Sequence, residues 1–279
     1  MIRRHAALQT TSDLVKLAVI FAILLIFLFP FLWVFLTSVR PENELFSDTF
    51  RFISETITFA NYEALLESEF PRYILNSLIV CVPATFIAVV VSFMAAYSFS
   101  RRRFRWRGPL LILVVFSQLF PWVILVTPVY SLFYRLNLVN SFPGLIIAYI
   151  AITVPFTLYM LLGYLDSVPR ELDEAAVIDG CSTLGTMWRV VLPVAWPGVA
   201  ATAIYAFAQC WNEFLFALTL MTRSEVKTIP VGLAGFFGEY STNWGLVMAA
   251  SVVTTLPTLV IFLLLKRQLV SGLTAGAVK

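Results

Sequence analysis

Long apolar runs alternate with short polar intervals along the whole chain, and this pattern predicts six membrane-spanning helices. A helix needs about 20 predominantly apolar residues to cross the hydrocarbon core of a bilayer. Apolar runs of that length occupy residues 14–37, 73–99, 109–130, 143–165, 194–221 and 244–265. The first run is too long for the apolar part of a signal peptide, and no small-residue cleavage site follows it. We therefore expect an all-α polytopic membrane protein that keeps all six helices.

The chain shows no internal repeat, so we expect one transmembrane domain over residues 1–279. Its helical core is predicted at residues 71–265, and a short polar tail follows at 266–279. In the longest outer loop, residues 58–67 form a pattern typical of a short amphipathic helix. The simplest interpretation of that helix is an interfacial segment without a special role.

Composition supports a membrane protein and excludes several other classes. Hydrophobic residues make up 60% of the chain and charged residues 13%, whereas soluble domains carry about 25% charged residues. A net charge of +3 is too small to indicate nucleic-acid binding. The three cysteines, Cys81, Cys181 and Cys210, are scattered and show neither metal-ligand spacing nor a disulfide pattern. We expect no metal site, no catalytic residues and no cofactor bound by this chain.

The distribution of charge predicts the orientation in the membrane. Thirteen of the nineteen basic residues fall on the side that holds both termini, the arginine cluster at 101–107 and the interval 171–193. The opposite side carries the other six basic residues and nine of the sixteen acids. Basic residues accumulate in cytoplasmic loops, so both termini and the interval 171–193 are predicted to be cytoplasmic. The arginine cluster would then anchor the topology, with contact to anionic lipid head groups as a second role.

The polar interval 171–193 predicts two short helices between two spans. Pro169 suits the first turn of a helix, and Gly180 suits a left-handed residue that ends it. Ser182 can cap a second short helix, and Pro193 is expected to stop that helix before the next span. An ordinary solvated loop that happens to be helical is the alternative.

The residues Glu174-Ala175-Ala176, then Gly180, then Leu192-Pro193 resemble the "EAA…G…LP" cytoplasmic loop of ABC importer permeases. The chain shows the fuller form EAAxIDG, with Arg189 before VVLP. The resemblance implies a coupling loop, residues 166–193, that docks on an ATPase subunit. The coupling residues that it implies are Glu171, Asp173, Glu174, Ala175, Ala176, Asp179, Gly180, Arg189, Leu192 and Pro193.

The fifth predicted span carries a polar stripe. Its members fall at helical steps of 4, 3, 1 and 3 and so share one helix face; they are Tyr205, Gln209, Asn212, Glu213 and Phe216. Glu213 is the one acid that we place inside a span, and an ionisable residue there is by default a functional-site hypothesis. The stripe could line a transport pathway or its gate. It could instead form hydrogen bonds with a partner subunit, or hold a protonated acid.

Two other spans contain features that could interrupt a helix. The third span carries Gln118, Pro121 and Pro128, and the fourth has an interruption at Thr153-Val154-Pro155. Proline removes a backbone donor and leaves carbonyl groups free. Such backbone is tolerated where it lines a cavity or is buried in protein. Gln118 therefore joins the candidate pathway residues, and simple packing is the alternative.

Further segments resemble sugar permeases of the maltose type. They are Asn76-Ser77, Gln118-Leu119-Phe120-Pro121, Trp211-Asn212-Glu213-Phe214 and the ending 270–279. The resemblance implies the type I architecture of ABC importer permeases, and a tail that contacts the ATPase dimer. It also implies that the glycine-rich outer loop at 222–243 reaches an extracellular binding protein through Gly235, Phe236, Phe237 and Gly238. A plain hairpin loop is the alternative at this place.

The resemblance implies a carbohydrate importer, with a di- or oligosaccharide as cargo. This chain would pair with a second, related permease in a heterodimer, on two ATPase subunits that hold ATP and Mg. The protein would be located in a prokaryotic cytoplasmic membrane. It would contact membrane lipid and would not bind nucleic acid. The chain has no phosphate-binding loop, so we do not expect it to hydrolyse ATP. The alternatives are another cargo, such as glycerol phosphate or a polyamine, an ion-coupled secondary transporter, and a membrane scaffold without transport activity.

Overall fold

The computed structural model describes residues 2–45, 52, 54, 56–238 and 242–277, with side chains described within 13–45, 52, 54, 56–238 and 242–266. Over these residues the chain is helical, apart from turns, loops and an isolated antiparallel bridge between Phe237 and Thr242. The predicted all-α class is therefore confirmed. The chain divides into two compact units, residues 1–69 with 236–253 and residues 70–235 with 254–279.

The first unit contains α1 (Ile2–Ser38), α2 (Glu42–Leu45), α3 (Ala60–Glu67) and the start of α13 (Trp244–Ala277). Helix α3 confirms the short helix predicted in the first outer loop. Its Asn61 side chain donates to the carbonyls of Ser38 and Arg40, at 2.9 and 3.1 Å, and so fixes α3 to the end of α1. The most apolar stretch of α1 has no buried residue, so its side chains are free to face lipid or another chain.

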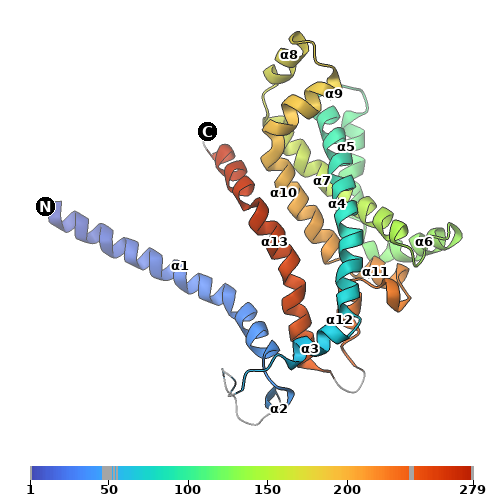
Figure 1. Cartoon of the computed structure of the whole chain (residues 1–279). Coiled ribbons are helices and arrows are strands. Elements are labelled where there is room, and N and C mark those ends of the chain that lie inside the picture. Colours follow the sequence, from blue (N-terminus) through green and yellow to red (C-terminus); the bar gives the residue numbers. More distant parts are fainter. Residues whose placement is uncertain (1, 46–51, 53, 55, 239–241, 278–279) are drawn as a thin grey trace. The chain divides into compact units, whose positions relative to one another are not determined.

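The second unit is built around three long helices that pack side by side (Figure 1): α4 (Phe70–Arg101), α7 (Phe142–Ser167) and α10 (Leu192–Trp211). Its other elements are α5 (Arg107–Ser117), α6 (Trp122–Arg135), α8 (Glu171–Ile178), α9 (Thr183–Gly185), a π-helical turn (Thr186–Val191), α11 (Leu215–Leu220), η2 (Ser224–Val226), α12 (Ile229–Ala234) and the rest of α13. Buried side chains from α4, α7, the π-helical turn and α10 form one apolar cluster, which includes Phe93, Leu161, Val191 and Val199.

A polar contact joins α4 and α7 inside their interface. The hydroxyls of Ser92 and Thr157 lie 2.6 Å apart, and both side chains are fully buried. Thr157 also donates to the carbonyls of Thr153 and Val154, and Ser92 reaches Val154 at 3.3 Å. Helix α7 continues through Pro155, so the interruption predicted at Thr153-Val154-Pro155 is wrong. The two hydroxyls find their partners inside the helix pair, as buried polar groups require.

Two other predicted spans are less regular than the sequence suggested. Among the described residues, five helices are long and apolar enough to cross a membrane, and the pair α5 and α6 makes a sixth span if it counts as one. This pair bends by 97° at Gln118–Pro121, because Pro121 cannot donate to a helix ladder and restricts the residue before it. The predicted fifth span is also divided: α10 ends at Trp211, and α11 follows as a separate short helix.

The predicted stop at Pro193 is wrong as well. The chain runs without a break from α9 through the π-helical turn into α10, and Pro193 occupies the first turn of α10. The amide of Leu192 bonds to the carbonyl of Met187, five residues earlier, as in a π-helix. The wider turn accommodates a proline that cannot donate, so the helix absorbs Pro193 instead of ending. At the other end of the chain, α13 continues beyond the predicted span to Ala277; residues 278–279 of the predicted tail lie outside the described residues.

Gly198 of α10 is required by close contact with α7. A Cβ atom at this position would overlap the ring of Tyr164, whereas a Cβ at Gly163 of α7 would meet no atom of this chain within 4 Å. We predict that Gly198→Ala destabilises the protein by about 1–3 kcal/mol, because the ring must move out of a packed interface. Gly163→Ala is the matched control and should be neutral or stabilising, since alanine favours helix by about 1 kcal/mol. Thermal unfolding in detergent measures both, and equal midpoints for the two variants would contradict the packing argument.

Candidate functional site

All five residues predicted from the sequence as pathway residues line one cavity in the second unit. The cavity has a volume of about 530 Å³, within the range of small-ligand sites. Tyr205 and Gln209 come from the last turns of α10, Asn212 and Glu213 from the segment after it, and Gln118 from the break between α5 and α6. The cavity therefore lies where two broken helices meet α7, which contributes Thr153 and Phe156.

The lining of the cavity combines aromatic rings with amide side chains. Trp122, Phe156 and Phe214 contribute rings, and Phe156 lies 4.4 Å from Tyr205 between ring centroids. The side-chain nitrogen of Gln118 is buried and has no hydrogen-bond partner among the described residues. A buried amide donor without a partner is costly, so this atom is available to a ligand or to water. Aromatic faces with amides between them provide stacking surfaces and hydrogen-bond donors in one place.

The polar stripe predicted that Glu213 lies on the face of a continuous helix, and the structure differs. It follows the end of α10, and its two carboxylate oxygens accept the amides of Phe216 and Ala217 at 2.8 and 3.1 Å. These amides belong to the first turn of α11, where a helix has unsatisfied donors and a favourable potential for an anion. The hydroxyl of Tyr149 donates to the Glu213 carbonyl at 3.3 Å. Glu213 therefore builds the cavity wall by starting α11.

Asn212 also departs from the predicted stripe. Its side-chain amide donates to the carbonyl of Ala208 at 2.8 Å, which also accepts the backbone amide of Asn212 at 3.1 Å at the end of α10. Phe216 lies on α11 and is buried. Only Tyr205 and Gln209 share a helical face of α10 as the spacing predicted. The break after Trp211, which periodicity could not show, is what turns the later residues toward the same cavity.

The loop predicted to couple to an ATPase has the two-helix form that the sequence indicated. Helix α8 starts at Glu171 with three acids in its first turn, and Gly180 follows it with a φ of +81°. The amide of Cys181 bonds to the carbonyl of Ala176 at 2.9 Å, which closes the helix end. The Ser182 hydroxyl accepts the amide of Gly185 at 3.2 Å and caps the second helix. Figure 1 shows α8 and α9 beyond the ends of α4, α7 and α10.

The exposed residues of this loop differ in part from those predicted. Ala176 is 4% exposed and packs inside this chain, so it cannot belong to a docking surface. Leu192 is partly buried against the apolar cluster, and Pro193 is exposed but lies in the first turn of α10. The other predicted residues except Asp173 are exposed, namely Glu171, Glu174, Ala175, Asp179, Gly180 and Arg189. Sequence reasoning missed Ile178, which is 86% exposed although isoleucine is normally a core residue.

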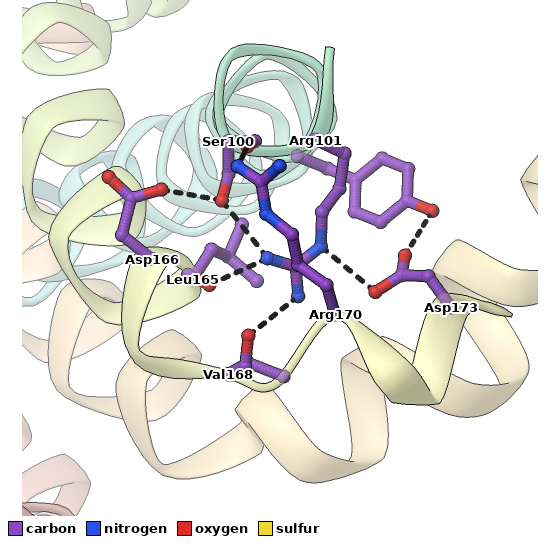
Figure 2. Close-up of polar contacts among 8 residues, drawn as sticks. Ser100, Arg101, Leu165, Asp166, Val168, Arg170 and Asp173 are labelled. Atoms are coloured by element: carbon purple, nitrogen blue, oxygen red, sulfur yellow. Dashed lines mark hydrogen bonds and ion pairs between the residues drawn. The ribbon is translucent and has the colours of Figure 1, made fainter.

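Asp173 is committed to contacts within the chain (Figure 2). One carboxylate oxygen accepts the Arg101 Nε at 2.9 Å, and the other accepts the hydroxyl of Tyr97 at 2.7 Å. Arg101 was interpreted from the sequence as one of five arginines that anchor the topology. The structure distinguishes it from its exposed neighbours Arg102 and Arg103, because its side chain is only 9% exposed. A sequence signal for this pairing would require a pattern across 72 residues, which local spacing cannot provide.

The predicted outer loop contains a helix that packs on α4. The side chain of Asn76 donates to the carbonyls of Glu225 and Lys227, each at 2.9 Å, and the Ser77 hydroxyl accepts the amide of Ile229 at 2.8 Å. These contacts explain why the second span begins with the polar pair Asn76-Ser77. Gly232 of α12 lies against the ring of Tyr73, where a Cβ would overlap it.

The four residues predicted to contact a binding protein follow α12. Gly235 ends that helix, and Phe237 and Gly238 are exposed. Phe236 is half-buried. Phe237 packs edge-on against Trp244 at 6.0 Å between ring centroids. Residues 239–241 of the loop lie outside the described residues.

Comparison with known proteins identifies the class. Residues 88–271 match the family model "Binding-protein-dependent transport system inner membrane component". The chain is 38% identical over 269 residues to the trehalose/maltose transport system permease protein MalG of Thermococcus litoralis, covering 94% of this chain and 96% of that protein. It is 35% identical over 253 residues to the sulfoquinovosyl glycerol transport system permease protein SmoH of Agrobacterium fabrum, covering 90% and 89%.

A solved structure has the same fold. It belongs to a bacterial ABC transporter involved in the import of the acidic polysaccharide alginate, and it aligns with a TM-score of 0.78 at 20% identity, covering 91% of this chain and 95% of that chain. The chain belongs to the binding-protein-dependent transport system inner membrane component family. It is a multi-pass membrane permease of an ABC importer, and the resemblance noted in its motifs is confirmed.

The Glu213 contacts generate a prediction about local stability. Glu213→Ala removes a charged acceptor from two amides of α11, and such hydrogen bonds contribute about 1.5–3 kcal/mol. We expect the amides of Phe216 and Ala217 to exchange with deuterium about tenfold faster or more, because 1.4 kcal/mol corresponds to a factor of ten. Exchange of peptides covering 214–221, measured by mass spectrometry, tests this. Glu225→Ala is the control, since that exposed side chain caps nothing in α11; equal exchange in both variants would exclude the capping role.

Proposed function

We propose that this permease forms half of the translocation pathway for a neutral di- or oligosaccharide. The observation that carries the proposal is the cavity, which gathers Gln118, Tyr205, Gln209, Asn212 and Glu213 from separate elements beside aromatic rings. Sugar hydroxyls require hydrogen-bond donors and acceptors, and the apolar faces of sugar rings stack on aromatic side chains. The cavity offers both kinds of contact, at the kind of broken-helix site where transporters hold their substrates.

The charge of the cavity favours a neutral cargo. Its described lining contains no lysine or arginine, which a glycerol phosphate or an acidic sugar would need as a counter-charge. Its one carboxylate, Glu213, is already bound to two backbone amides, which disfavours a polyamine cargo. Two relatives of this chain are named for trehalose and maltose and for diacetylchitobiose, which are neutral saccharides, whereas another is named for sulfoquinovosyl glycerol, which carries a sulfonate. The composition of the cavity lining, and not these names, therefore carries the proposal of a neutral cargo.

The exposed part of the loop 166–193 is proposed as the surface that binds an ATPase subunit. Ile178 and the acids of α8 present apolar and negatively charged groups side by side, which fits a partner cleft with apolar and basic walls. The ATPase subunits would hold ATP and Mg, and a second, related permease would complete the pathway. Because ATP is cytoplasmic, this assignment places the loop in the cytoplasm, in agreement with the excess of basic residues on that side.

An extracellular binding protein is the proposed donor of the sugar. The family description names dependence on a binding protein, and a related alginate transporter has been solved in complex with a periplasmic protein that carries an alginate pentasaccharide. Gly235, Phe236, Phe237 and Gly238 remain the proposed contact in this chain. The exposed Phe237 offers an apolar side chain that a partner surface could cover.

Gln209→Ala tests the cavity. We expect uptake of labelled sugar by proteoliposomes that contain the full complex to fall roughly tenfold, because an amide that bonds sugar hydroxyls in transit contributes about 1–1.5 kcal/mol. The sugars to compare are trehalose, maltose and diacetylchitobiose, with an alginate oligosaccharide as the acidic probe. Assembly with the ATPase should not change.

Ser98→Ala is the control for this substitution. Ser98 is also a polar residue in a span, but it is exposed, and among the described residues its hydroxyl bonds only to the carbonyl of Met94 in its own helix. Uptake should therefore stay at the parent rate. If Gln209→Ala also transports at the parent rate, the cavity does not contact the cargo; if the parent complex prefers the alginate oligosaccharide, the proposal of a neutral cargo is wrong.

Gly180 tests the coupling loop. Gly180→Val places a β-branched residue at a φ of +81°, at a cost of about 1–3 kcal/mol of local strain, although nothing lies within 4 Å of the new Cβ. We expect less ATPase to co-purify with the permease pair and sugar uptake to fall. Gly180→Asn is the matched control, because asparagine tolerates the left-handed conformation. This variant should keep both the co-purification of the ATPase and the sugar uptake. Equal co-purification with both variants would mean that the turn does not shape a docking surface.

A further inference from the structure

We propose that Arg101 is a positioning residue that ties the coupling helix α8 to α4 and α7, so that a displacement of α8 moves both membrane helices. The proposal rests on the proposed function of the loop as the ATPase contact. It assigns to Arg101 a role beyond that of an arginine in a cytoplasmic basic cluster. The contacts in Figure 2 carry the argument.

The guanidinium of Arg101 bonds to two different elements. Its Nε donates to Asp173 of α8 at 2.9 Å. Its Nη1 and Nη2 donate to the carbonyls of Leu165 and Val168, at 3.1 and 3.0 Å, where α7 ends. Carbonyls at a helix C-terminus lack helical partners and attract a cation. One side chain at the end of α4 therefore satisfies the end of α7 and holds α8.

Asp173 is held from two sides by α4. Besides Arg101, the hydroxyl of Tyr97, one turn earlier on the same helix, donates to its second oxygen at 2.7 Å. The two ionic side chains are 9% and 16% exposed, so water competes little for these bonds. A pair of this kind keeps a defined geometry, whereas an exposed ion pair changes partners readily.

A second arginine also links the start of α8 to α4, but here the arginine belongs to the α8 side and the acceptor to α4. Arg170, just before α8, donates to the carbonyl of Ser100 near the end of α4 at 2.8 Å. The Ser100 hydroxyl in turn donates to Asp166 of α7 at 2.6 Å. The ends of α4 and α7 thus each receive an arginine from the neighbouring segment. Helix α8 also packs against the π-helical turn that leads into α10, while the polar bonds described for its side chains go to α4.

Geometry rather than charge distinguishes Arg101 from its neighbours. Arg102 and Arg103 contribute equally to the basic cluster but are exposed. A lysine at position 101 keeps the positive charge that sets the topology, but a single ammonium group cannot reproduce a planar fork that reaches α7 and α8 together. Arg101→Lys therefore removes the tie and keeps the topology.

The experiment uses the full complex with its binding protein in proteoliposomes, and compares Arg101→Lys, Asp173→Asn and the double variant with the parent. Three quantities are measured: ATPase co-purification, binding-protein-stimulated ATP hydrolysis, and sugar transported per ATP hydrolysed. We expect co-purification to stay within about twofold, because the exposed face of α8 is unchanged. Sugar transported per ATP should fall by about fivefold or more. The double variant should be no worse than the single variants, since both remove the same link. Arg102→Lys is the control and should match the parent.

Each outcome decides between defined alternatives. Parent values of sugar per ATP in Arg101→Lys and Asp173→Asn would overturn the positioning role. Loss of the ATPase from these variants would also overturn it, because the pair would then shape the docking surface and not transmit its movement. If the loop does not bind the ATPase at all, Gly180→Val will also keep the ATPase and the transport rate. Failure of the proposed function is thereby distinguished from failure of this inference.

Discussion

Every backbone polar group inside a bilayer must find a partner within the protein, and this constraint explains most of the irregular features of the chain. Two prolines illustrate it. Pro193 is absorbed by a π-helical turn. Pro121 breaks its span, and the break lines a cavity, where non-helical backbone is tolerated. Pro83 and Pro155, by contrast, lie inside α4 and α7, which continue past them.

The same constraint places the polar side chains. Glu213 supplies the acceptor that starts α11, and the Asn212 side chain adds a second donor to the Ala208 carbonyl at the end of α10. Arg101 supplies donors to the end of α7. Each residue bonds to the backbone of a helix end, and each also occupies a place of proposed function. Capping and proposed function therefore fall on the same residues.

The proposed cavity and the proposed ATPase contact are linked by continuous helices. Helix α7 contributes Phe156 to the cavity and ends at Ser167, beside the residues that hold α8. Helix α10 carries Gln209 at one end and continues from the π-helical turn at the other. Packed helices move as rigid bodies more readily than they deform, because their interfaces are close-packed. Helix α7 is continuous from its cavity residue Phe156 to its end at Ser167. A movement imposed on α8 can thus reach the cavity wall through α7.

The sequence alone determined the helical membrane class, the approximate positions of the spans, and the two-helix form of the loop with its left-handed Gly180. These features depend on local chemistry: apolar run length, proline and glycine geometry, and capping spacing. The sequence also selected the five cavity residues. The argument that the stripe residues share one helix face, however, holds only for Tyr205 and Gln209. Only the tertiary structure decided that the other three reach the same cavity, because two helix breaks turn the backbone there. Likewise only the fold could pair Arg101 with Asp173 and bury Ala176, since contacts across 72 residues leave no periodic signal in a single chain.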